Sequence, residues 1–213
     1  MKQVSVVLNG FRRPFSLEKQ YNAVKAQTVP AKEIFMWKNH PENETQFDFS
    51  KYTDLAISSN NANYGVWARF AFALNTTSEY ICVLDDDTIP SEKWFENCIH
   101  CIENENNGLY GTIGVIFNDL DYRSYIRHGW ANPNEETKEV DIVGHSWFFH
   151  RDLLGAFWRE STVPVSHLCG EDMHFSYAIQ KYLDLKTYVP PHPKDDKSLW
   201  GSDPELANRF GVD

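Results

Sequence analysis

The sequence predicts an α/β fold in which a mixed, mainly parallel sheet is flanked by helices. Strand and helix patterns alternate through the first half of the chain, which is the order that parallel strands with crossover helices require. The apolar run that ends in three aspartates, YICVLDDD at 80–87, shows no polar alternation, which is typical of a strand buried on both faces. A chain of 213 residues is long enough for one substantial core, so we expect one domain over 1–213.

β-branched runs, helical spacing and turn residues place the elements of the first half. In order, they are a strand at 3–9, a helix beginning near Pro14, strands at 33–38 and 54–59, a loop at 60–65, a helix at 66–74 and a strand at 80–87. Proline suits a first helical turn, and Ser91 can cap the helix that follows the aspartates. Ligands bind at the carboxyl ends of the strands in such a sheet, which is where the aspartates fall.

The second half mixes strand and helix patterns less regularly. In order, we expect a strand at 109–117, a polar insertion or β-ribbon at 118–139, a strand at 140–150, a short helix at 151–158, a loop at 161–170, a helix at 171–183 and a strand at 186–190. The polar segment at 191–213 lacks apolar periodicity, and we expect it to be a mobile tail. The chain is equally compatible with being one module of a longer protein.

Charge and cysteine content narrow the partners and the compartment. Lys and Arg number 20 against 30 Asp and Glu, which gives a net charge of −10. Nucleic-acid affinity comes mainly from phosphate neutralisation, so we expect no nucleic-acid partner, and a phosphorylated ligand would need a metal or a few basic side chains. Cys98 and Cys101 form a C-x2-C with no second pair, which suits either zinc or core thiols. The four cysteines do not suggest a disulfide framework in a chain of this size, so we expect a reducing compartment and a cytoplasmic location. No apolar run approaches the roughly 20 residues that cross a bilayer, and no signal peptide is evident, so we expect no membrane span.

Three consecutive carboxylates directly after a buried strand repel one another and need a positive partner. In an extended strand Asp85 and Asp87 share one side and Asp86 takes the other. Two oxygen ligands on one side suit Mg²⁺ or Mn²⁺. The alternative is a solvated turn that places acids at the start of the next helix, which explains one aspartate better than three.

The stretch NYGVWARFAFALNTTSEYICVLDDDTIPSEKW at 63–94 resembles the GT-A class of nucleotide-sugar glycosyltransferases, and its DDD element resembles the exostosin-like branch of that class. Three further stretches extend the likeness in the right order: VSVVLNGFRRPFSLEKQYNAVKAQTVPAKEIFMWKN, DIVGHSWFFHRDLL and CGEDMHFSYAI. Together they cover most of 3–190, and the resemblance implies a nucleotide-binding part at about 1–90 and an acceptor part at about 110–190. The whole also resembles the N-terminal domain of a large chlorovirus-encoded glycosyltransferase, which would place the protein in the host cytoplasm.

The resemblance implies a metal centre at the last aspartate. Asp87 would bind Mn²⁺ or Mg²⁺, and Asp85 and Asp86 would face the ribose and the donor sugar. His192, after the last strand, would be a further metal ligand. An acidic pocket rejects a diphosphate unless a divalent cation inverts the local field, and the cation then acts as a Lewis acid on the leaving phosphate.

The loops after the first strands are expected to hold the nucleotide base and the donor. The expected residues are Asn9, Gly10, Arg13, Asn60, Asn61 and Arg69. Asparagine amides suit uracil, although Asn60 and Asn61 can equally be turn residues and Arg13 a surface charge. Arg69 lies mid-helix among apolar residues, so an interior partner such as Asp86 or a phosphate is expected.

The CGED stretch is expected to supply the catalytic carboxylates. Asp172, with Glu171 beside it, would be the general base if the reaction inverts the anomeric carbon, or would steady the transition state if the reaction retains it. The alternative is a pair of acids at a helix N-terminus. His145, Trp147 and Trp130 would line the sugar pocket, with core packing as the alternative for the two tryptophans.

The sequence therefore predicts a metal-dependent glycosyltransferase that moves a hexose or deoxyhexose to a hydroxyl of a glycan acceptor. Its donor would be a UDP-sugar of the UDP-glucose or UDP-rhamnose type. A sugar-nucleotide nucleotidyltransferase is the first alternative, but NGFRRP has one glycine where those enzymes carry a glycine-rich loop. A non-catalytic cation- or carbohydrate-binding module is the second, although contiguous DDD lacks the spaced ligands of a calcium loop.

Overall fold

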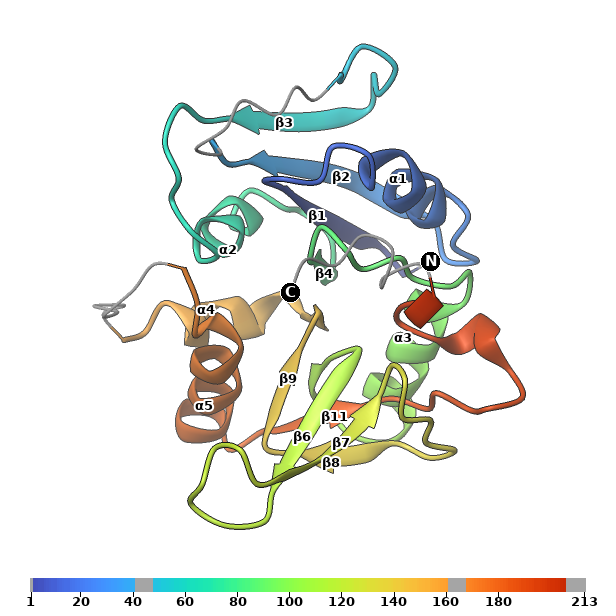
Figure 1. Ribbon diagram of the computed structural model, residues 1–213, viewed down its shortest axis with the longest axis vertical. Helices are drawn as coiled ribbons and strands as arrows, with labels where there is room; N and C mark the ends of the chain where they lie inside the picture. The colour runs from blue at the N-terminus through green and yellow to red at the C-terminus, as the bar shows by residue number, and fades with distance from the viewer. Residues whose placement is uncertain (1, 41–47, 161–167, 206–213) are drawn as a thin grey trace.

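One mixed sheet of eight strands organises the computed structural model, which describes residues 2–40, 48–160 and 168–205 (Figure 1). From one edge to the other the strands are β3 (Leu55–Ser59), β2 (Ala31–Lys38), β1 (Val4–Gly10), β4 (Tyr80–Leu84), β10 (Ser146–His150), β5 (Gly108–Tyr110), β11 (Lys186–Val189) and β8 (Lys138–Val140). β3, β2, β1 and β4 run parallel, and β10 is antiparallel to both of its neighbours. The expected α/β class with a mainly parallel sheet is confirmed.

The central strands β1 and β4 carry apolar side chains on both faces. Val6 and Leu8 point into one core layer, whereas Val7 between them points into the other. Cys82 and Val83 of β4 divide between the layers in the same way. An unalternating sequence therefore gives a strand that is buried on both sides, as parallel strands under helices require.

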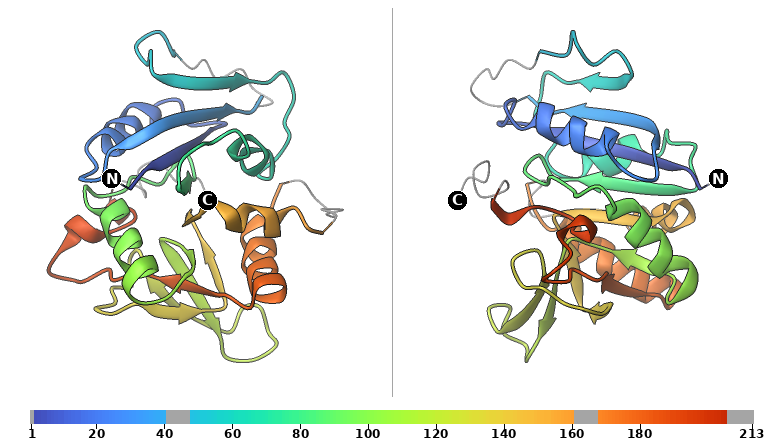
Figure 2. Two further views of the ribbon diagram at one scale, coloured as in Figure 1. Left: turned by 180° about the vertical axis from the view of Figure 1, so that it is seen from behind. Right: turned by 90° about the vertical axis from the view of Figure 1, so that its right-hand side faces the viewer.

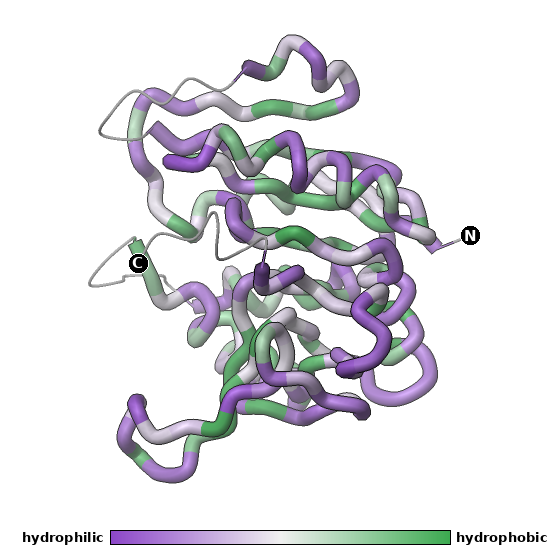
Figure 3. The backbone as a smooth tube through the Cα atoms, turned by 45° about the vertical axis from the view of Figure 1, so that its right-hand side comes forward, coloured by the Kyte–Doolittle hydropathy of each residue, from purple (hydrophilic) through white to green (hydrophobic). Residues whose placement is uncertain are grey.

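Helices cover the two faces of the sheet (Figure 2). The layer with α1 (Leu17–Lys25) and α3 (Trp94–Asn104) buries Leu17, Val24, Trp94, Phe95 and Cys98. The opposite layer contains α2 (Ala68–Ala73), α4 (Leu154–Phe157) and α5 (Glu171–Leu183), with Phe70, Phe157 and Phe175 at its centre. Figure 3 shows the hydrophobic strands inside and hydrophilic connections outside. Cys98 and Cys101 are buried free thiols of the α3 layer, as the core alternative predicts.

A small antiparallel sheet lies beyond the large one and changes two sequence expectations. It pairs β6 (Ile113–Phe117) with β7 (Tyr125–Gly129) and with β9 (Ile142–Gly144). The single strand expected at 109–117 was wrong, because β5 and β6 belong to different sheets. The chain crosses between them at Gly111, where a Cβ would approach the Val143 Cβ to 2.5 Å. The strand expected at 140–150 likewise separates into the end of β8, β9 and β10.

Two helix starts also differ from expectation. The first helix begins at Leu17 rather than near Pro14, after a turn in which the Ser16 hydroxyl donates to the Arg13 carbonyl oxygen (2.7 Å). The Ser91 cap was wrong, because α3 begins after Lys93 and no side chain caps it. Ser91 instead fixes the tail, its N–H donating to the Trp200 carbonyl oxygen (3.0 Å).

The polar tail begins as a packed segment. Trp200 and Ser202 are buried, and the short 3-10 helix η2 (Lys197–Leu199) lies against α3. The expectation of a mobile tail extends to 206–213, which lie outside the described residues. Within the described ranges, no helix has the length and apolar character needed to span a membrane.

Candidate active site

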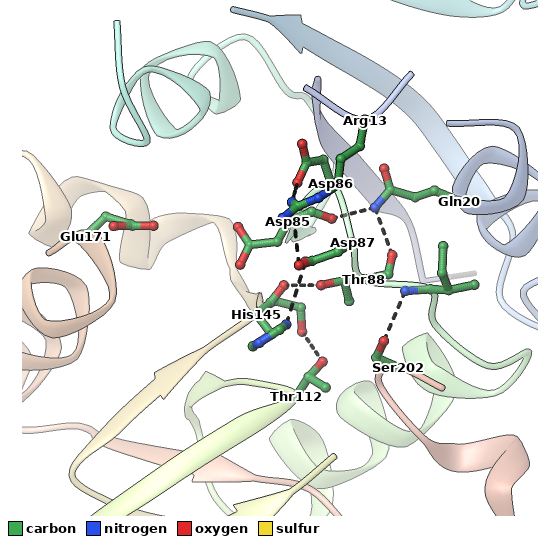
Figure 4. A network of polar contacts seen from close by, with 12 residues as sticks. Arg13, Gln20, Asp85, Asp86, Asp87, Thr88, Thr112, His145, Glu171 and Ser202 are labelled. Atoms are coloured by element: carbon green, nitrogen blue, oxygen red, sulfur yellow. Dashed lines mark hydrogen bonds and ion pairs between the residues drawn. The ribbon is translucent and has the colours of Figure 1, made fainter. Parts of the chain in front are cut away.

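The three aspartates form a tight turn that is held by hydrogen bonds from two directions (Figure 4). β4 ends at Leu84, and the Thr88 N–H then donates to the Asp85 carbonyl oxygen (3.1 Å). The side-chain amide of Gln20, on α1, donates to the Asp85 and Thr88 carbonyl oxygens (2.6 and 2.8 Å). From the other side, the His145 carbonyl oxygen accepts from the Asp85 N–H (3.1 Å) and the Thr88 hydroxyl (2.7 Å). This turn fixes the direction of each carboxylate.

Asp85 and Asp87 come together, as expected, but through the turn rather than through an extended strand. Their carboxylate oxygens and one His145 ring nitrogen all lie within 4.8 Å of one another. The Nδ1 atom of His145 lies 3.8 Å from Asp87 Oδ1 and accepts or donates no hydrogen bond within the described residues. Two carboxylates and one imidazole form a donor set that suits Mn²⁺ and, through the two oxygens, Mg²⁺. His145, which the sequence placed on the sugar, lies beside the two carboxylates in a group that could hold a metal ion.

His192, expected as a metal ligand, does not join this group. Its ring is fully buried; Nδ1 lies 2.9 Å from the Pro190 carbonyl oxygen, and Nε2 accepts from the Gly201 N–H (3.1 Å). Burial lowers the pKa of His192 to about 4, so the ring is neutral. Its two nitrogens are occupied by the backbone, and it fastens the start of the tail to the domain.

Asp86 turns away from the group and pairs with Arg13, whose guanidinium also lies 3.6 Å from Asp87. Burial raises the pKa of Asp86 to about 6, against the opposing effect of the Arg13 charge. Burial, and then the charge of Asp85, also raises the pKa of Asp87. The turn therefore sets three carboxylates against two arginines, Arg13 and Arg69, the second of which pairs with Asp85, and a bound cation would stabilise it.

Arg69 is a buried link between the aspartate turn and α5. Its two terminal nitrogens donate to Asp85 and to Glu171, the latter at 2.7 Å, and its guanidinium lies 4.7 Å from the centre of the Trp147 ring. An interior partner was expected, but it is Asp85 and not Asp86. The side chain is 1% exposed, so Arg69 acts on the site through the two carboxylates that it holds.

Glu171 and Asp172 open α5 after Gly170, whose φ of 94° lets the chain turn into the helix. Burial raises the pKa of Glu171 to about 7, against the effect of Arg69. Burial likewise raises the pKa of Asp172, whose Oδ1 accepts from the Met173 N–H (2.7 Å). No hydrogen bond to Asp172 Oδ2 arises from the described residues. Arg69 donates to Glu171, whereas the described residues give Asp172 no side-chain donor, so Asp172 keeps an oxygen free.

Two cavities meet at the aspartate turn and share Asp85. The Arg13 cavity, of about 330 Å³, is lined by Asn9, Phe11, Arg12, Arg13, Val66, Arg69, Asp85, Asp86 and Asp87. The Asp172 cavity, of about 260 Å³, is lined by Asp85, Ile113, Val115, Phe117, Tyr122, Tyr125, Arg127, Ile142, Val143, Gly144, His145, Trp147, Glu171 and Asp172. A ligand that spans both must pass the Asp85, Asp87 and His145 group.

The expected base-binding residues divide into two sets. Asn9 and Arg13 line the Arg13 cavity, together with Phe11 and Arg12, which the sequence reasoning did not single out. Arg69 lines it too, whereas Gly10, Asn60 and Asn61 do not. The Gly10 carbonyl oxygen accepts from the Asn39 N–H, the Asn60 side chain donates to the Lys38 carbonyl oxygen (3.0 Å), and Asn61 is exposed. Asn60 therefore follows the turn alternative.

Trp130 stacks on His145 at the edge of the Asp172 cavity. The ring centroids are 5.4 Å apart and the rings are inclined by 24°. Both residues have left-handed backbones, with φ of 46° and 65°, a conformation that costs energy and persists at functional sites. Trp147 is buried against Phe70 while also lining the cavity.

Comparison with known proteins gives this site a class. The fold matches that of the GT-A glycosyltransferases, and the structure is similar to that of GalNAc-T7 with UDP, GalNAc and Mn²⁺ (TM-score 0.69, 14% identity, 89% of this chain and 42% of that chain). It is also similar to S. aureus TarS (TM-score 0.61, 15% identity, 90% and 35%). The chain belongs to glycosyl transferase family 2, whose family model matches residues 5–161. It spans less than half the length of the two solved proteins, and a search of curated proteins gives no match.

Proposed function

We propose that this glycosyltransferase is metal-dependent and moves a hexose or deoxyhexose from a UDP-sugar to a hydroxyl of a glycan acceptor. The observation that carries the proposal is the group formed by Asp85, Asp87 and His145 at the junction of two cavities. A nucleotide-sugar would fit this arrangement, with its nucleotide in one cavity, its sugar in the other and its diphosphate at the metal group between them. The Mn²⁺ and UDP in the GalNAc-T7 structure support the choice of cation and carrier.

In this proposal the residues of the Arg13 cavity bind the nucleotide. Asn9 offers its amide to the base, and Arg13 contributes positive charge near the diphosphate while it remains paired with Asp86. Asp85, Asp87 and His145 would hold Mn²⁺ or Mg²⁺, which would supply positive charge to the leaving diphosphate. The four free thiols suit a reducing compartment such as the cytoplasm.

The residues of the Asp172 cavity act on the acceptor. The free oxygen of Asp172 takes the proton from the acceptor hydroxyl, whose oxygen forms the new bond to the anomeric carbon as the diphosphate leaves with the bonding electrons. Arg69 donates to both Glu171 and Asp85 and so holds these two carboxylates in place, which leaves Asp172 as the acid that faces the acceptor. Asp172 with a pKa raised by burial is a stronger base than an exposed aspartate.

The first prediction concerns the metal. Uridine diphosphate with Mn²⁺ should raise the melting temperature clearly more than uridine diphosphate with a chelator, because a ligand that binds the folded state stabilises it by mass action. Differential scanning fluorimetry over a nucleotide series measures this, with Mn²⁺ alone as the control. Equal rises in melting temperature with and without chelator would show that nucleotide binding does not depend on a metal. Release of pyrophosphate from a nucleoside triphosphate and a sugar phosphate would favour a nucleotidyltransferase instead.

The second prediction concerns Trp130, which we propose positions His145. Trp130→Ala should weaken Mn²⁺ binding by about tenfold, the usual range for a residue that orients a ligand, because the imidazole loses the ring that fixes its plane. Trp130→Phe keeps a stacking face and should retain most of the affinity. Calorimetric titration of Mn²⁺ with uridine diphosphate present measures both variants. Equal affinities in the alanine variant and the wild type would make the stacking incidental.

A further inference from the structure

An apolar groove lies beside the Asp172 cavity, between α5 and the connection from β6 to β7. We call it the Tyr177 groove; its volume is about 370 Å³ and it is lined by Phe117, Asp119, Leu120, Tyr122, Asp141, Ile142, Met173, Tyr177 and Gln180. Figures 1 and 2 show the β6–β7 connection next to the end of α5. Leu120 is fully exposed, and Tyr122, Met173 and Tyr177 are each about half exposed. Large apolar side chains grouped at the surface mark a binding face.

The groove continues from the Asp172 cavity. Phe117, Tyr122 and Ile142 line both. Successive residues of α5 divide between them, since Asp172 lines the cavity and Met173 lines the groove. A molecule whose hydroxyl lies at Asp172 therefore extends into the groove if it is longer than one sugar ring.

The lining has the chemistry of a sugar site. Tyr122 and Tyr177 offer aromatic surface to the apolar face of a sugar ring, and Tyr122 is supported by Phe117, whose ring centre lies 5.7 Å away. The rim carries Asp119, Asp141 and Gln180, whose oxygens accept hydrogen bonds from hydroxyls. Asp141 is held in place, because its Oδ2 accepts from the Phe117 N–H (2.7 Å) and its carbonyl oxygen accepts from the Gln180 amide (3.0 Å).

The charges around the Tyr177 groove favour a neutral sugar over an anionic acceptor or an alkyl chain. The ionisable groups on the rim of the groove are the two carboxylates of Asp119 and Asp141. Lys181, whose ammonium lies 5.0 Å from the Tyr177 ring centre, is paired with Glu160. An anionic acceptor would be repelled by the carboxylates, and an alkyl chain would desolvate them without replacing their hydrogen bonds. A neutral sugar satisfies the aromatic floor and the acidic rim together.

We propose that the Tyr177 groove binds the second sugar of a neutral oligosaccharide acceptor, next to the sugar whose hydroxyl lies at Asp172. This rests on the proposed function. The acceptor is then an oligosaccharide of at least two sugars, and binding of the second sugar positions the first for transfer.

The test compares neutral disaccharides (cellobiose, maltose, lactose and chitobiose) with the corresponding methyl monosaccharides on the whole chain with uridine diphosphate and Mn²⁺. Saturation-transfer NMR measures binding, and nucleotide release from UDP-sugars measures transfer. At least one disaccharide should bind more tightly than its monosaccharide. Tyr177→Ala should weaken that disaccharide by about fivefold or more and leave the monosaccharide unchanged, because Tyr177 lines the groove and not the Asp172 cavity. Tyr177→Phe should retain binding. Leu183→Ala, on the same helix and also partly exposed, is the matched control and should change neither.

The outcomes separate the groove from the proposed function. Tyr177-dependent disaccharide binding without nucleotide release would support the groove and count against transfer. Transfer that is equal for monosaccharide and disaccharide, and unaffected by Tyr177→Ala, would overturn the groove and leave the function. Loss in Tyr177→Ala of octyl glucoside binding, with disaccharide binding unchanged, would overturn the proposal in favour of an apolar aglycone. An absence of binding by every disaccharide would also overturn it.

Discussion

Replacing Asp87 with alanine is expected to abolish the metal-dependent part of uridine diphosphate binding while leaving the fold intact. Asp87 lies beside Asp85 and, among the residues that the structure describes, makes no ion pair closer than 3.6 Å. Burial and the Asp85 charge raise its pKa, which means that the folded protein disfavours its charged form when no cation is bound. Removing the Asp87 carboxylate therefore relieves repulsion in the metal-free protein, and it takes away one metal-coordinating group when the cation binds. Calorimetry with uridine diphosphate, with and without Mn²⁺, measures the loss.

Asp86→Ala is the matched control, since it removes a neighbouring carboxylate that is closely paired with an arginine, as Asp87 is not. Asp86 is buried and paired with Arg13, so the alanine variant leaves a mostly buried guanidinium without its closest partner, at a cost of about 3 kcal/mol of stability. Thermal denaturation should separate the two variants: the melting temperature of Asp86→Ala should fall below that of the wild type, and that of Asp87→Ala should not. Retention of Mn²⁺-dependent binding in Asp87→Ala would show that the metal, if one binds, uses other residues.

The elements that the sequence predicted best are those defined by local pattern. The helix expected at 171–183 matches α5 residue for residue, because helical spacing of Phe175, Ala178 and Ile179 follows a glycine that ends the preceding loop. The strand expected at 80–87 forms over its apolar part, 80–84, whose five residues are all buried, and the three aspartates leave the strand. Local pattern did not reveal that one apolar run at 109–117 serves two sheets, because a run of apolar residues looks the same on either side of a bend.

His145, the third member of the candidate metal group, could not be predicted from local sequence, because a long-range strand pairing brings it to the aspartates. β10 lies antiparallel to β4 with Ser146 opposite Leu84, and this register places His145 next to the aspartate turn. No local sequence pattern specifies that pairing, so His145 was assigned to the sugar and the metal was given to His192 on family likeness. The likeness of the DDD element to the exostosin-like branch stays a prediction. The kind of partner that Arg69 has could be predicted from the sequence, because a buried arginine within an apolar helix requires carboxylate partners.

Asp172→Asn is expected to preserve the fold and the affinity for uridine diphosphate while lowering the transfer rate by about 100-fold or more, the typical contribution of a positioned base. Asparagine has nearly the same shape and can still accept from the Met173 N–H, so α5 keeps its first turn. It cannot take a proton from the acceptor. Turnover is measured by nucleotide release with acceptor present, and donor affinity by calorimetry with Mn²⁺.

The pH dependence of transfer gives this prediction a second readout. Burial raises the pKa of Asp172 above that of an exposed aspartate, and a general base acts only when deprotonated. The rate should therefore rise with pH through that raised pKa and level off above it. Asp172→Asn should lose this rise together with the rate. A structural role alone would lower the rate at every pH and leave the shape of the profile unchanged.

Glu171→Gln separates the two neighbouring acids. Glu171 is buried and accepts from Arg69 at 2.7 Å, so the glutamine variant removes a charge that offsets a fully buried guanidinium and should lower the melting temperature. Asp172→Asn should not. If Asp172→Asn turns over normally, Asp172 is only an acid at the start of a helix and Glu171 becomes the first candidate for the base. If donor binding collapses while the fold survives, Asp172 belongs to the donor-sugar site, and a mechanism that retains the anomeric configuration becomes the better account.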